Sequence, residues 1–169
     1  YPVLTPLGVG PGQPFPYISG LSLSLAVLAA DPTTGEERFA RVKVPEGLER
    51  FVSTGRRYVP LESLIADRLP MLFPGMEILE HAVFRVTRNA DFELSDDADD
   101  LLEAVESELR RRRFGEVVRL EISASTSASM MQRLVKGLDI EPDQVYEIDG
   151  LLDPSDLLQL AGGAERPEL

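Results

Sequence analysis

A strict alternation of side chains constrains the fold of this chain more than any other feature. From Leu21 to Val27 every second residue is a large apolar one, and the residues between them are Ser22, Ser24 and Ala26. A period of two is typical of a β-strand. The turn residues of 31–35 follow, and 40–44 alternates in the same way. We therefore expect an antiparallel hairpin with one face exposed to water.

Three further segments have strand character. Residues 78–88 carry apolar side chains on both faces, which predicts a strand that is covered on both sides for part of its length, with Ile78 on the same side as Phe84. Residues 118–122 alternate between apolar and charged side chains, and 145–148 are predicted to form a short strand before a glycine turn.

Helical periodicity separates these strands. It predicts helices over 61–69 after Pro60, over 96–113, over 131–138 after a serine-rich link, and over 154–160. Strands and helices of this kind indicate an α+β fold. We expect a mixed or mostly antiparallel sheet of about five strands, with about four helices packed on it.

The length of 169 residues, of which 43% are hydrophobic, suits one compact domain. Residues 1–17 hold five prolines and three glycines and are predicted to be an extended lead-in, 18–160 the domain, and 161–169 a linker. The chain starts at Tyr1 without a secretory pattern and lacks an apolar run of bilayer length. We expect a soluble, cytoplasmic piece of a longer protein.

Composition excludes several kinds of partner. The formal net charge is −12, which disfavours nucleic acid as a partner. The sequence has no cysteine, so disulfide partners and thiolate metal sites are excluded. His81 is the single histidine, so most catalytic constellations cannot be built from this chain. The sequence predicts no catalytic, cofactor-binding or metal-ligating residue.

The end of the 78–88 strand holds the strongest candidate site. Arg85 and Arg88 are three apart on a strand and should face opposite sides, and Asn89 or Asp91 in the turn beyond could orient Arg88. These four residues are candidates for an anion or interface contact, and a plain turn role is the alternative. Arg110 to Arg113 could clamp a phosphate chain or only complement the negative end of a helix dipole.

Three other motifs favour structural interpretations. The glycines of 8–12 lack the strand, helix and Lys-Ser/Thr of a phosphate loop. The acids of 96–100 lack the glycine turn and terminal glutamate of a calcium loop and match a helix start. His81 has no second histidine as a partner and fits a surface or half-buried strand position.

Several motifs together resemble a known family. Residues 15–23 read Phe-Pro-Tyr-Ile-Ser-Gly-Leu-Ser-Leu, 39–45 read Phe-Ala-Arg-Val-Lys-Val-Pro, and 84–94 read Phe-Arg-Val-Thr-Arg-Asn-Ala-Asp-Phe-Glu-Leu. With 73–77 and 110–115, these segments make the chain similar to the middle, or head, domain of bacterial polyphosphate kinase.

The resemblance implies a function for the parent protein. That enzyme reversibly transfers the terminal phosphate of ATP to polyphosphate through a phosphohistidine, with magnesium, as a homo-oligomer that can associate with the membrane. Its catalytic histidines lie in other domains, and no position here matches them. We therefore expect a structural and dimer-contact domain that is inactive alone, with ATP and magnesium needed only by the parent enzyme and the other domains of the same polypeptide as partners.

Two alternatives remain open. One is a polyphosphate- or nucleotide-binding module that uses Arg85, Arg88 and Arg110 to Arg113. The other is an interaction domain acquired by another protein.

Overall fold

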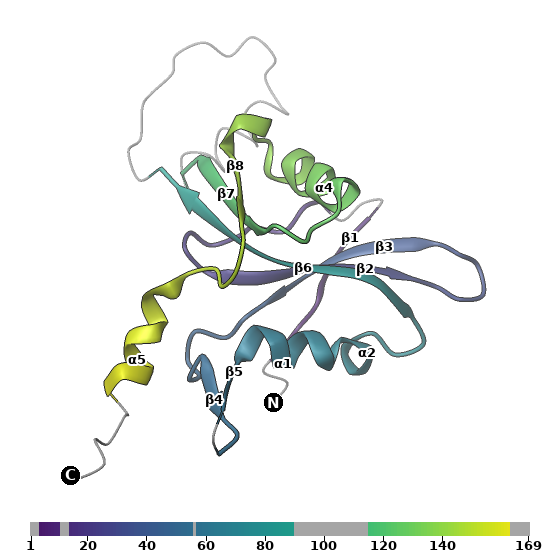
Figure 1. Ribbon diagram of the computed structural model, residues 1–169. Coiled ribbons are helices and arrows are strands. Elements are labelled where there is room, and N and C mark those ends of the chain that lie inside the picture. The colour runs from purple at the N-terminus through teal and green to yellow at the C-terminus, as the bar shows by residue number, and fades with distance from the viewer. Residues whose placement is uncertain (1–3, 11–13, 56, 90–114, 163–169) are drawn as a thin grey trace, which may run out of the picture.

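The computed structural model describes residues 4–10, 14–55, 57–89 and 115–162 (Figure 1). Its main sheet has six strands in the order β1-β3-β2-β6-β7-β8, and β4 and β5 form a separate antiparallel ribbon. The strands are β1 (Leu7–Val9), β2 (Leu23–Ala30), β3 (Glu37–Lys43), β4 (Phe51–Ser53), β5 (Tyr58–Pro60), β6 (Glu77–Arg88), β7 (Val117–Ser123) and β8 (Val145–Ile148).

The sheet is mixed. All of its strand pairs are antiparallel except β7 with β8, which run parallel. The helix α4 (Ala128–Leu138) makes the crossover between these two strands, as a parallel pair requires. This arrangement confirms the α+β class.

Helices cover both faces of the sheet (Figure 1). Within the described residues α1 (Leu61–Asp67) and α2 (Leu69–Leu72) lie on one face and α4 on the other, while α5 (Leu157–Gly162) extends away from the sheet. Three helices therefore pack on the sheet where about four were expected, and the strands number six plus two where about five were expected. The predicted 96–113 helix lies outside the described residues.

The hairpin of β2 and β3 is confirmed, but its exposed face is not. All eight residues of β2 are buried, because this strand lies between β3 and β6 and beneath helices on both sides. On the face expected to be wet, Ala26 belongs to the core beneath α4, and Ser24 is fully buried and accepts a hydrogen bond from Nε of Arg41. Leu21 was expected on the apolar face, but it precedes the strand with a φ of 62° and is 60% exposed.

Each face of the sheet has its own core. Between α4 and the sheet the large, fully buried side chains include Ile18, Phe84, Leu120, Ile122, Met130 and Leu134. Between the sheet and the layer of α1 and α2 the buried side chains include Leu25, Val27, Val42, Ile65 and Leu69. Since two layers of apolar side chains sandwich β2 and β6, the strand 78–88 is covered as predicted.

A β-bulge in β6 corrects the side predicted for Ile78. The pairing with β2 passes from Glu80 to Ile78, which leaves Leu79 as the extra residue. The extra residue reverses the alternation, so Ile78 packs under α1 and α2 rather than with Phe84. A regular period of two cannot reveal this reversal.

The strand β1 lies inside the predicted lead-in. Residues 7–9 are extended as expected, but they also pair with 39–41 of β3 and form one edge of the sheet. No helix of the described residues is long and apolar enough to cross a membrane.

The close contact between Gly115, just before β7, and Asn89, just after β6, gives a test of the fold. Gly115 has a φ of +71°, and a Cβ there would lie 2.0 Å from the carbonyl oxygen of Asn89. We expect Gly115→Ala to lower the free energy of unfolding by about 2 kcal/mol or more, because the left-handed backbone and the clash both oppose alanine. Urea unfolding measures the change. Gly47→Ala is the control, because a Cβ at Gly47 meets nothing within 4 Å. An equal loss of stability in both variants would contradict the close approach of Gly115 to Asn89.

Candidate functional site

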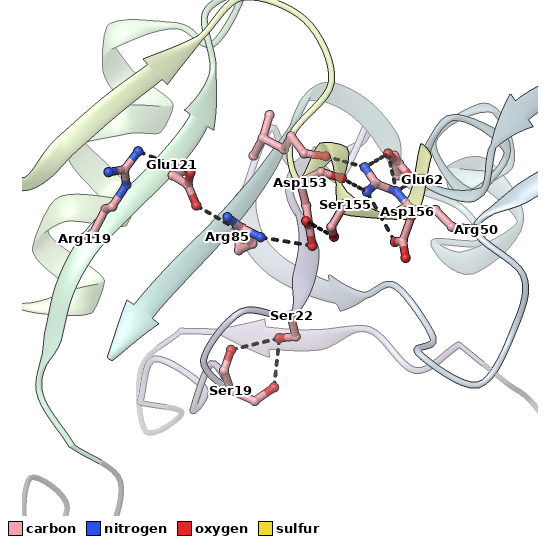
Figure 2. Close-up of polar contacts among 11 residues, drawn as sticks. Ser19, Ser22, Arg50, Glu62, Arg85, Arg119, Glu121, Asp153, Ser155 and Asp156 are labelled. Carbon is pink, nitrogen blue, oxygen red and sulfur yellow. Dashed lines mark hydrogen bonds and ion pairs between the residues drawn. The ribbon is translucent and has the colours of Figure 1, made fainter. Parts of the chain in front are cut away.

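Within the described residues, arginines and acidic residues alternate in a row of contacts that links several elements of the fold (Figure 2). It passes from β7 through β6 and the turn at 152–156 to α1. We call it the charged row, and its members are Arg119, Glu121, Arg85, Asp153, Arg50 and Glu62.

Arg85 occupies the middle of the charged row. Its Nε lies 2.7 Å from Oε2 of Glu121, its partner in the register of β7, and its Nη1 lies 2.9 Å from Oδ2 of Asp153. Burial lowers the pKa of Arg85, but the hydrogen bond and charge of Glu121 and the charge of Asp153 outweigh burial and raise it above its ordinary value. Both sides of this guanidinium are therefore neutralised within the domain.

Arg50 is the most buried cation of the row. Its side chain is 5% exposed, and its Nη2 lies 2.7 Å from Oε1 of Glu62, which is equally buried in the first turn of α1. The same guanidinium donates to the backbone carbonyls of Leu152 and Asp153 and lies 3.4 Å from Oδ2 of Asp156. A buried charge requires such complete pairing.

Asp153 is held from two directions. Its carbonyl accepts from Arg50, while its carboxylate binds Arg85 and accepts a hydrogen bond from the hydroxyl of Ser155. Its φ of 51° is unusual for a residue other than glycine. Burial raises the pKa of Asp153, but the hydrogen bond from Ser155 and the charge of Arg85 prevail and lower it. The turn therefore has a fixed conformation.

A cleft of about 260 Å³ adjoins this turn. The ionisable groups in its lining are Glu46, Arg50, Asp153 and Asp156. Three carboxylates against one arginine that already binds Glu62 make a poor receptor for phosphate.

The side chain of Arg88 lies on the opposite face of β6 from that of Arg85, as the spacing predicts. Its Nε donates to the carbonyl of Ile18 at 2.8 Å, its Nη1 donates to the carbonyl of Gly115 at 2.6 Å, and its guanidinium lies 4.6 Å from the centre of the Tyr17 ring. Burial lowers its pKa, which the charge of Tyr17 partly opposes. Arg88 therefore ties the lead-in to the start of β7.

The structure describes only some of the remaining predicted residues. The backbone N–H of Asn89 donates to the carbonyl of Glu116 at 2.8 Å and extends the pairing of β6 with β7. Asp91 and Arg110 to Arg113 lie outside the described residues. His81 is exposed on β6, a surface position of the kind predicted. Among the described residues no group of three or more His, Asp or Glu side chains could hold a metal ion.

Sequence reasoning missed most of the charged row. Arg50 and Glu62 belong to no motif, and Asp153 was interpreted only as a helix start. The alternation of Arg119 with Glu121 on one face of a predicted strand was the single signal that could have located Glu121.

Comparison with known proteins identifies a family model and relatives that match this chain. A family model described as the polyphosphate kinase middle domain matches residues 1–160. The chain is 52% identical over 182 residues to a polyphosphate kinase of Mycobacterium ulcerans, covering 100% of this chain and 24% of that protein. It is 51% identical over 186 residues to a polyphosphate kinase of Mycobacterium tuberculosis, covering 100% of this chain and 25% of that protein.

A solved structure shares the fold. The crystal structure of polyphosphate kinase from Porphyromonas gingivalis matches 94% of this chain and 23% of that chain, with a TM-score of 0.72 and 23% sequence identity. The chain thus spans about a quarter of the length of the proteins it matches.

The burial of Arg50 predicts a large stability effect. We expect Arg50→Ala to lower the free energy of unfolding by about 3–5 kcal/mol, because Glu62 would remain buried without its counter-ion. Urea unfolding at pH 7 measures this. Arg133→Ala is the matched control, since its pair with Glu37 has the same 2.7 Å separation but is 45% exposed on both sides, and it should cost about 1 kcal/mol or less. Similar losses of unfolding free energy in both variants would show that burial does not determine how much the Arg50 ion pair contributes to stability.

The lowered pKa of Asp153 predicts a pH dependence. Because the folded pKa lies below the ordinary value of 3.8, the ionised carboxylate stabilises the fold above that value, and this contribution disappears as the pH falls through the folded pKa. We expect Asp153→Asn to be about 1–2 kcal/mol less stable than the unaltered chain at pH 7. The difference should shrink in acid. Denaturant unfolding between pH 7 and pH 3 checks it, and a constant difference would show that the charge is not responsible.

Proposed function

The chain belongs to the polyphosphate kinase family as its middle domain, and on this premise we propose that it is a non-catalytic domain which positions the catalytic parts of the enzyme and contributes to contacts between subunits. The whole enzyme, in this proposal, transfers the terminal phosphate of ATP to polyphosphate reversibly and through a phosphohistidine. ATP and magnesium then bind in other domains of the polypeptide.

The internal use of the arginines carries this proposal. Arg50, Arg85 and Arg88 direct their donors to carboxylates and backbone carbonyls of the same domain. A phosphate chain would have to displace these partners, at the cost of leaving buried groups unpaired. Arginines arranged in this way stabilise a scaffold rather than a phosphate channel.

The position of His81 supports the same conclusion. A phosphorylated histidine requires a neighbouring group that orients the imidazole and a cation that neutralises the phosphate. His81 is exposed in the middle of β6. The carboxylate of the adjacent Glu80 accepts from the backbone N–H and the hydroxyl of Ser127 at 2.9 and 2.7 Å, so it caps α4 instead of orienting the histidine.

An activity assay tests the proposal. Incubated with ATP labelled on its terminal phosphate and with magnesium, the isolated chain should form neither polyphosphate nor acid-labile phosphoprotein, whereas the full-length enzyme should form both. His81→Asn is the control for labelling of the chain itself. Label that appears on the chain and disappears in this variant would overturn the proposal.

The alternative of a polyphosphate-binding module makes a different prediction in solution. Titration of the chain with polyphosphate at low salt would then show an affinity that falls steeply with added salt and with Arg88→Ala.

A further inference from the structure

The helix α5 exposes apolar side chains at the point where the chain leaves the domain. Leu157 is 43% exposed and Leu158 is 78% exposed. The helix extends away from the sheet (Figure 1). Two adjacent leucines on a projecting helix leave an apolar surface that water covers only at a free-energy cost.

The direction of this helix is fixed at its base. Arg50 holds the carbonyls of Leu152 and Asp153, and Arg85 holds the carboxylate of Asp153 (Figure 2). Pro154 then begins a short 3₁₀ turn. The carbonyl of Pro154 accepts a hydrogen bond from the backbone N–H of Leu157. Proline restricts φ, so the segment from Asp153 to Leu157 has little freedom to swing.

We propose that α5 is the docking helix for the polypeptide segment that follows it in the full-length polyphosphate kinase, and that Arg50 and Arg85 act as positioning residues by holding Asp153. The proposal rests on the proposed function, because it names the residues through which this domain orients its neighbour.

The length of the relatives identifies the occupant. They are about four times as long as this chain, and the matching family is described as a middle domain, so in such proteins further chain adjoins this helix. A covalently linked segment is present at a high effective concentration beside α5 and therefore covers Leu158 more readily than a second copy does.

Thiol labelling tests the docking. The chain has no cysteine, so Leu158→Cys and Met71→Cys each introduce one thiol. Met71, on α2, is the matched control because it is 75% exposed. In the isolated chain both variants should react with a maleimide at similar rates. In the full-length enzyme, read by peptide mass spectrometry, Leu158→Cys should react at least about tenfold more slowly than in the isolated chain, and Met71→Cys should change by less than about threefold.

Two results would overturn the docking proposal. The first is equal reactivity of the Leu158→Cys variant in the two proteins. The second is protection of that variant in the isolated chain that increases with protein concentration, since a second copy would then be the occupant. Neither readout depends on phosphate transfer, so the activity assay and the labelling assay can fail separately.

Two further variants at Asp153 test the ion pair through which Arg85 holds this turn. In the full-length Leu158→Cys enzyme, adding Asp153→Ala should abolish most of the protection, while adding Asp153→Glu should restore part of it because the carboxylate returns. Arg133→Ala, which removes a half-exposed ion pair elsewhere, should leave the protection unchanged. Full protection in the folded Asp153→Ala variant would show that α5 docks without the help of Arg85, since this substitution removes the carboxylate that Arg85 binds and keeps the carbonyl that Arg50 binds.

Discussion

The buried ion pair between Arg50 and Glu62 is the constraint on which much of this domain depends. Both side chains are 5% exposed, and a buried guanidinium needs an acceptor in each direction. Glu62 supplies one side, and the carbonyls of Leu152 and Asp153 supply the other. A single cation, next to the start of the β4–β5 ribbon, therefore joins the first helix to the turn at 152–156.

The sequence predicted the elements with a clear local period. The hairpin of β2 and β3, the long β6, and α4 were all expected within a few residues of their observed bounds. Three features could not be predicted because they depend on the tertiary structure. They are the burial of both faces of β2, the reversal at the bulge before Glu80, and the pairing of the three-residue β1 with β3.

The candidate site was predictable only in part. The spacing of Arg85 and Arg88 correctly placed them on opposite faces of one strand, because that result needs only the geometry of a strand. Their partners could not be predicted, since Arg88 bonds Ile18, which lies 70 residues away. The role of Arg85, Arg88, Asn89 and Asp91 in an anion or interface contact stays a prediction, and Asp91 lies outside the described residues.

The sequence separation of the Arg50 contacts also has a consequence for synthesis on the ribosome. Arg50 is translated 102 residues before Leu152 and 103 before Asp153, the residues whose carbonyls complete its pairing. The nascent domain therefore holds an incompletely paired arginine until its final turn emerges, and buried charge in that state opposes early compaction. We therefore expect the packing around Arg50 to be completed only after the turn at 152–156 has emerged from the ribosome.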